Sequence, residues 1–235
     1  MKNRQILLDV LVEQLPLEYV DALINGITRL YKEADQSVKE NTQLGEAEKK
    51  YVRPHLLRGL IETHFRNSAI DTGLIAAVAS NDADTAEYTV VTAGSVELTH
   101  SKTDGPNAVP SLCDFREQRS DANNMLHQQK LFPAPVEEKK QSKTYAILTH
   151  GPAKQEDEDE CDEQEYKLGY LKIGFPSPDG DGWAELPIDL IDIKEKIQVR
   201  DAKEAITVDV ELEKARQPKL KQTNFDKNDN KKDDE

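Results

Sequence analysis

The apolar residues change their period along this chain, and the order of the two periods restricts the fold more than any other feature. Through residues 4–67 apolar side chains recur every three or four positions, which is typical of amphipathic helices. From Tyr88 onward they alternate with polar residues, which is typical of strands that bury one face. Helices followed by strands predict an α+β fold, with an N-terminal helical region followed by a mostly antiparallel β-sheet domain.

Three helices are expected in the N-terminal region. A first apolar stripe covers residues 6–15, and Pro16 suits the first turn of a second helix. A third helix is expected over residues 54–66. The second helix carries the longest apolar stripe, and three residues at its centre are Leu23, Ile27 and Leu30.

The sheet domain is expected to contain a helix as well as strands. Strands are expected at residues 88–92, 96–100, 143–150, 167–175 and 183–193, and a helix at 111–131. Residues 155–165 are almost entirely acidic and predict a solvated loop. The expected organisation is a helical region at 1–70, an antiparallel-sheet α+β domain at 71–215 and a disordered tail at 216–235.

The charge of the chain argues against several classes of partner. The net charge is −14, which disfavours broad nucleic-acid binding, because such binding neutralises phosphates. No apolar run approaches the roughly 20 residues that a membrane helix needs, so no membrane is expected as a partner. Two cysteines, Cys113 and Cys161, stand far apart without a partner motif. They favour a reducing, cytoplasmic setting.

The stretch FPSPDGDGW, residues 175–183, is a candidate calcium loop. If Gly182 takes the sixth position of such a loop, Asp179 and Asp181 fall at ligand positions. Ile188 then falls where a bidentate glutamate is required, so the cage is incomplete. Proline, aspartate and glycine between two alternating runs instead predict a turn between strands. No metal and no cofactor are expected.

The tripeptide Leu-Thr-His occurs twice, and it ends in His100 and His150. Two histidines at the ends of neighbouring strands could act as an acid–base pair on a phosphoester, with Arg58 as a possible third residue. A chance repeat is the simpler interpretation, with two histidines that close strands beside loops.

The segment RPHLLRGLIETHFR gives an acidic chain its most basic helical face. His55, Arg58, Glu62 and Arg66 fall on one side of a helix, and could bind a phosphate or an acidic partner. The simpler interpretation is a solvated face on which Arg58 and Arg66 each pair with Glu62, four residues away.

These observations predict a cytoplasmic interaction or regulatory protein without catalytic activity of its own. Its partner is expected to be another protein or a second copy, bound through the N-terminal helices. The residues expected to contact a partner are His55, Arg58, Arg66, Leu23, Ile27 and Leu30. The alternative is a phosphoester or nucleic-acid hydrolase that uses His100, His150 and Arg58. A single cavity shared by both histidines would favour the enzyme.

Overall fold

The structure is a computed structural model that describes residues 2–81, 86–124, 143–153 and 166–216. Three helices come first, as expected: α1 (Lys2–Gln14), α2 (Leu17–Lys39) and α3 (Glu46–Asp71). The elements that follow are β1 (Ile75–Ser80), β2 (Glu87–Ala93), β3 (Val96–Lys102), α4 (Asp114–Ser120), the 3-10 turn η1 (Asp121–Asn123), β4 (Thr144–Pro152), β5 (Leu168–Gly174), β6 (Ile188–Asp189) and α6 (Leu190–Arg216).

The strands form one mixed sheet, which confirms the α+β class. Its six strands lie in chain order, β1 to β6. All neighbours are antiparallel except β3 and β4, which run parallel and are joined through α4 and η1. The expected hairpin at Gly94 is present, and this glycine has a φ of 53°. The sheet is therefore mostly antiparallel, with one parallel pair at its centre.

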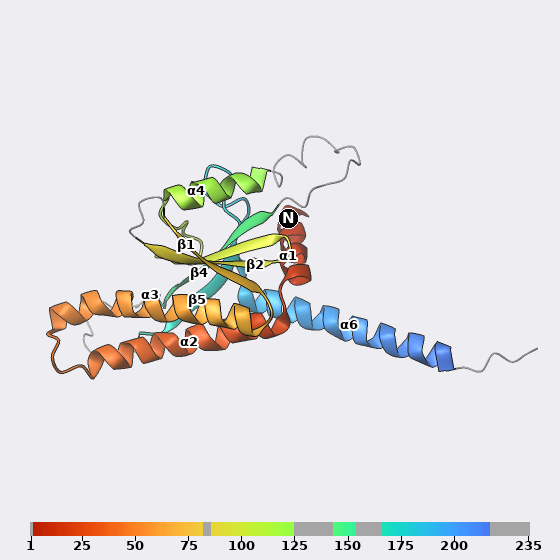
Figure 1. Cartoon of the computed structure of the whole chain (residues 1–235), viewed down its shortest axis with the longest axis horizontal. Helices are drawn as coiled ribbons and strands as arrows, with labels where there is room; N and C mark the ends of the chain where they lie inside the picture. Colours follow the sequence, from red (N-terminus) through yellow and green to blue (C-terminus); the bar gives the residue numbers. More distant parts are fainter. Residues whose placement is uncertain (1, 82–85, 125–142, 154–165, 217–235) are drawn as a thin grey trace, which may run out of the picture. The chain divides into compact units, whose positions relative to one another are not determined.

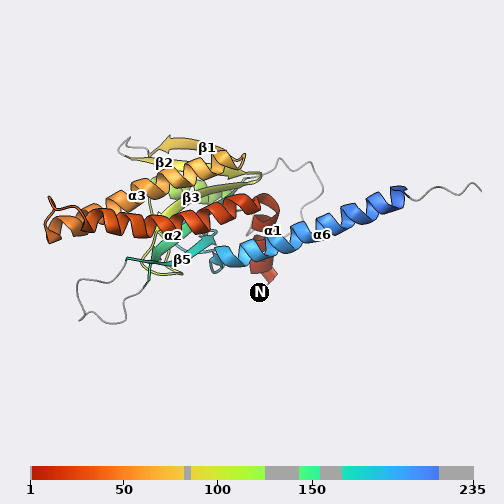
Figure 2. The same cartoon turned by 90° about the horizontal axis from the view of Figure 1, so that it is seen from below.

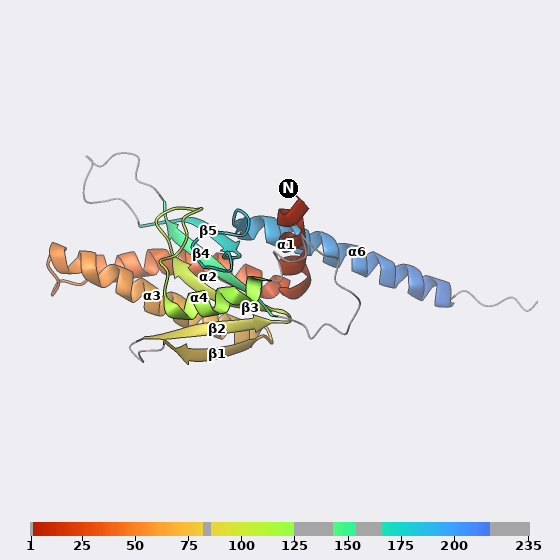
Figure 3. The ribbon, with the colours of Figure 1, turned by 90° about the horizontal axis from the view of Figure 1, so that it is seen from above.

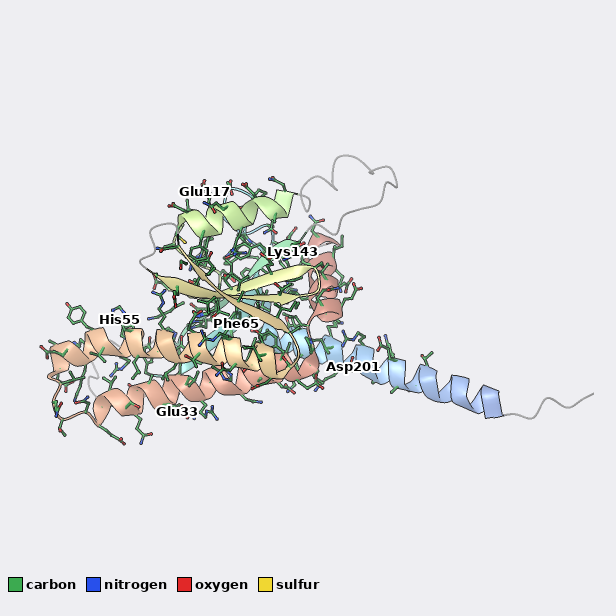
Figure 4. All side chains as sticks on the ribbon, viewed as in Figure 1. Glu33, His55, Phe65, Glu117, Lys143 and Asp201 are labelled. Carbon is green, nitrogen blue, oxygen red and sulfur yellow. The ribbon has the colours of Figure 1, made fainter. Side chains whose placement is uncertain are left out.

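Helices cover both faces of the sheet. The antiparallel pair α2 and α3 lies on one face, and α4 lies on the other (Figures 1 and 3). Figure 2, seen from below, shows α2 and α3 side by side in front of the sheet. Phe65 of α3 is fully buried between that helix and the sheet (Figure 4). The main hydrophobic core thus fills the space between the helical pair and the sheet.

A glycine allows α2 and α3 to approach closely. The ring of His64 on α3 lies against Gly26 on α2, where an added Cβ would lie only 1.8 Å from Nε2. The same nitrogen is 2.9 Å from the carbonyl oxygen of Ala22. His64 is therefore a hydrogen-bonded interior histidine that joins two helices.

Three expected elements differ from the structure. The third helix begins at Glu46 rather than residue 54, with Gly45 as its N-cap and Pro54 inside it. Strand β1 occupies a weakly patterned stretch in which no strand was expected. Of the helix expected at 111–131, the described part is α4 with η1.

The strand expected at 183–193 is wrong. Only β6 pairs with β5, and α6 begins immediately after it. Leu186 is 62% exposed, so the alternating pattern there does not mark a buried face. The carboxylate of Asp189 accepts a hydrogen bond from the backbone N–H of Ile191 at 3.0 Å. A side-chain bond to an N–H of the first turn favours the start of a helix.

The glycine-rich stretch before it forms a turn. The N–H of Ser177 donates to the carbonyl of Gly182 at 2.9 Å, and Pro176 pairs with Trp183 across the turn. Gly180 has a φ of 74°, which favours glycine. Asp179 accepts hydrogen bonds from within the same loop. The stretch thus has turn geometry, as the sequence predicted.

Helices and sheet share one compact unit. It runs from Met1 to Gln198, and residues 199–235 form a second unit. The hydrophobic core contains residues of α1, α2 and α3 together with the strands, on both sides of the boundary expected at residue 70. The acidic segment 155–165 and residues 217–235 of the expected tail lie outside the described residues.

Replacing Gly26 by alanine is expected to destabilise the fold by about 1–3 kcal/mol, because the new methyl group overlaps the His64 ring. Gly59→Ala is the matched control on α3, since nothing lies within 4 Å of a Cβ at that position. It should stabilise by about 0.5–1 kcal/mol. Urea unfolding measures both variants, and effects of the same sign would contradict the helix contact.

Candidate functional site

Strands β2 and β3 separate beyond the hairpin, and a cavity lies where they part. Their pairing is limited to Val91↔Leu98, Thr92↔Glu97 and Ala93↔Val96, although both strands continue. The halves of β2 and β3 that do not pair with each other, residues 87–89 and 99–102, line a cavity of about 490 Å³. Residues of α3, β4 and the start of α4 complete its wall. The opening in the sheet thus creates a candidate site.

The carboxylate of Glu62 spans this opening. Its Oε1 accepts a short hydrogen bond from the backbone N–H of Thr89 on β2. Its Oε2 lies 2.6 Å from Nε2 of His100 on β3. Burial alone would raise the pKa of Glu62. The hydrogen bond and charge of His100, together with the hydrogen bond from Thr89, have the larger opposite effect and lower the pKa to about 2. Glu62 is therefore an ionised group that joins α3 to both separated strands.

His150 lies beside His100 on the neighbouring strand. The parallel register of β3 and β4 pairs His100 with Leu148, two residues before His150. Side chains two residues apart share one face of a sheet, and the two imidazole centres are 5.7 Å apart. The hydroxyl of Tyr31 on α2 lies 2.8 Å from Nδ1 of His150. Burial lowers the pKa of His150, with further lowering from His100 and Lys102, so the ring is neutral.

The cavity wall contains buried polar atoms without a partner. Among the described residues, eight buried side-chain nitrogen or oxygen atoms have no hydrogen bond. Four belong to residues that line this cavity, namely Thr89 Oγ1, His100 Nδ1, Arg116 Nε and His150 Nε2. An unsatisfied buried polar group costs about 1–3 kcal/mol. Four such groups around one cavity indicate a site that a ligand completes.

Cationic side chains line the same cavity. Arg58 comes from α3, Lys102 from β3 and Arg116 from α4. Arg116 donates to the carbonyl of Ser111 and to the hydroxyl of Ser101, and Lys102 lies over the ring of Tyr166. Within the described part of the chain, no ion pair neutralises these three cations. The same wall carries the carboxylates of Glu62, Glu87 and Asp114, so an anionic group would have to bind directly to the cations.

The structure brings some of the sequence-predicted residues together. His100, His150, Arg58 and His55 all line the cavity, whereas Arg66 does not. The ion pairs expected between Glu62 and its neighbours on α3 do not form, because both carboxylate oxygens bind the sheet. Figure 4 shows His55 on the half of α3 that precedes Phe65.

The partner surface expected on the second helix needs correction. Leu23 and Ile27 are fully buried and Leu30 is 5% exposed, all within one chain. They belong to the core between α2, α3 and the sheet. A second copy therefore cannot contact them without unfolding that core. Dimer formation itself stays a prediction.

Sequence reasoning missed three residues of the site. Tyr31 lies within the apolar stripe of the second helix, and it contacts a histidine 119 positions away. The sequence predicts that Glu62 pairs with two arginines on its own helix. Cys113 has no partner motif in the sequence, and it lines the cavity. No local pattern connects these residues, because each contact depends on how α2, α3 and α4 pack on the sheet.

Comparisons with protein-family models, with curated proteins and with solved structures gave no match for this chain. Among the described residues, no three His, Cys, Asp or Glu side chains are grouped so that they could hold a metal ion. In the same residues, none of the helices combines the length and the apolar character that crossing a bilayer requires. The site must therefore be interpreted from its own geometry.

The Glu62 contact should make folding stability depend on pH. The pKa of this carboxyl is lowered from 4.5 to about 2 in the folded state, so its stabilisation is present above pH 4.5 and is lost as the pH falls toward 2. The contribution is up to about 3 kcal/mol. Urea unfolding of wild type and Glu62→Gln across this range should show a difference that shrinks toward low pH. A constant difference would contradict the lowered pKa.

The corrected position of Ile27 changes what its substitution should do. Ile27→Asp buries an unpaired charge and is expected to cost about 4 kcal/mol or more, which unfolds a marginal domain. Circular dichroism and urea unfolding measure this loss. A variant with wild-type stability and altered sedimentation would instead place Ile27 at an interface between copies.

Proposed function

We propose that the protein is an enzyme that cleaves a phosphoester by acid–base catalysis at His100 and His150. One observation carries this proposal. Both imidazoles line a single cavity, and each has a buried ring nitrogen without a partner. Histidines that serve only the fold normally satisfy both ring nitrogens, as buried polar groups do in general.

The charge and size of the cavity support a compact phosphoester as the substrate. Arg58, Lys102 and Arg116 supply positive charge without ion-pair partners in the described residues, in a wall that also carries three carboxylates. A volume of about 490 Å³ falls within the range of small-molecule sites. The net charge of −14 opposes long nucleic acids. A nucleic-acid substrate would therefore enter as a short, single-stranded end.

The reaction requires one proton to be taken and one to be delivered. An attacking O–H group loses its proton to an imidazole as its oxygen bonds to phosphorus. The bond from phosphorus to the leaving oxygen breaks, and that oxygen receives a proton. Arginine and lysine side chains stabilise the charge on the phosphoryl oxygens. Such proton transfer contributes about 10²–10⁴-fold to a rate.

A role as an interaction or regulatory protein is a second proposal, with a different surface. Strand β1 ends the sheet, since β2 is its only neighbour among the described strands. It contains no charged residue, and its Ile75 and Val78 are 69% and 47% exposed. Open edges of this kind pair with another strand. A second copy, joined through antiparallel β1 strands, would provide the self-association expected from the sequence.

We also propose the cytoplasm as the compartment. Cys113 is a free cysteine that lines the candidate site. Thiols remain reduced in the cytoplasm, whereas secreted proteins usually pair them. This proposal is supported by the cysteine alone.

Activity assays test the main proposal. The purified protein is incubated with 4-nitrophenyl phosphate, bis(4-nitrophenyl) phosphate and nucleoside 2′,3′-cyclic phosphates, with and without divalent metals. Turnover is expected for at least one of them, and His100→Gln and His150→Gln should each lower kcat/KM by about 10²-fold or more. His64→Gln is the matched control, because His64 does not line the cavity. Equal loss in all three variants, or no turnover of any substrate, would reject the enzyme.

A further inference from the structure

We infer that Glu62 and Tyr31 polarise the two cavity histidines in opposite senses, so that His100 presents a proton acceptor and His150 presents a hydrogen-bond donor. The ligand that fits this pair has a phosphoryl oxygen next to an O–H group. This inference deepens the proposed function and rests on it for the identity of the ligand. Glu62 and Tyr31 are positioning residues, since each acts through a histidine.

Glu62 determines the free atom of His100. Its carboxylate is ionised and accepts only, and it lies 2.6 Å from Nε2. Nε2 must therefore carry the hydrogen of the neutral ring. The lone pair is then on Nδ1, which is buried and has no partner. His100 thus has an unpaired acceptor beside the cavity that its ring lines, and the negative charge of Glu62 stabilises the ring when it takes a proton.

Tyr31 determines the free atom of His150. Burial raises the pKa of the Tyr31 hydroxyl, so the hydroxyl keeps its proton. Its contact with Nδ1 of His150, at 2.8 Å, is the only hydrogen bond of this hydroxyl within the described residues. The hydroxyl therefore donates and Nδ1 accepts, because the opposite assignment would leave a buried O–H without an acceptor. The hydrogen of the neutral ring is then on Nε2, which has no partner.

The two assignments give the two histidines different roles in the reaction. His100 Nδ1 takes the proton of the attacking O–H group, and the attacking oxygen bonds to phosphorus. His150 Nε2–H donates a hydrogen bond to a phosphoryl oxygen and stays neutral. The leaving oxygen then receives the proton from the His100 imidazolium. One histidine is thus the base, and the other is a fixed donor.

Nitrogen-15 spectroscopy of the histidine rings tests this inference without a substrate. Two-bond correlations at neutral pH distinguish a protonated ring nitrogen from an unprotonated one. We expect His100 and His150 both to carry hydrogen on Nε2. Tyr31→Phe should release His150 into a mixture of two tautomers and leave His100 unchanged. Tyr170→Phe is the matched control, because its hydroxyl binds Thr103 and Tyr170 does not line the cavity.

Hydrogen on Nδ1 of either ring in the wild-type protein would overturn the inference, as would a Tyr31→Phe spectrum identical to the wild-type spectrum.

Two phosphodiesters then identify the O–H group that attacks phosphorus. Bis(4-nitrophenyl) phosphate has no hydroxyl, so its turnover assigns water as the nucleophile. Turnover restricted to 2-hydroxypropyl 4-nitrophenyl phosphate assigns a substrate hydroxyl. If neither reacts while the tautomers are as expected, the proposed function and the ligand fail, and the polarity of the histidine pair stands.

Discussion

The Glu62 carboxylate takes the place of backbone pairing where β2 and β3 separate. One oxygen binds the N–H of Thr89 and the other binds His100. Without it, a backbone donor and a ring nitrogen would be left inside the protein, each at a cost of about 1–3 kcal/mol. The opening between the strands is therefore a stable feature of the fold. This opening provides the space for the cavity. The polar wall of the cavity comes from the parts of β2 and β3 that do not pair with each other.

Buried residues that serve only the fold differ from the candidate catalytic residues in how their polar atoms are hydrogen-bonded. The core between the helical pair and the sheet is largely apolar, with His64 hydrogen-bonded against α2 and the Tyr19 hydroxyl left without a partner. At the edge of this core, His100 and His150 each satisfy one nitrogen and leave the other without a partner. Unsatisfied groups reduce stability, and proteins retain them mainly where a ligand uses them. Four of the eight unsatisfied atoms in the described residues belong to side chains that line this one cavity.

The sequence predicted the fold class because the apolar period changes from helical to alternating, and this change depends only on local residues. The hairpin at Gly94 and the turn at Gly180 were predictable for the same reason, because each depends on neighbouring residues in the sequence. The cavity was not predictable, since it requires the register of β3 on β4 and the packing of α3 across both. The repeated tripeptide identified both histidines but could not show that they share a face. The contacts of Tyr31 and Glu62 with the histidines gave no signal, because these partners are distant in the chain.

The amide of Thr89 gives the most direct test of the central claim, that the Glu62 carboxylate bridges the separated strands. Its proton should resonate far downfield, exchange slowly, and shift only as Glu62 is protonated, near pH 2. An acid titration followed by proton–nitrogen correlation spectra measures this directly. The account predicts a Thr89 signal that is constant from neutral pH to about pH 4. A signal that titrates near 4.5, or an amide that exchanges as fast as those of exposed loops, would contradict it.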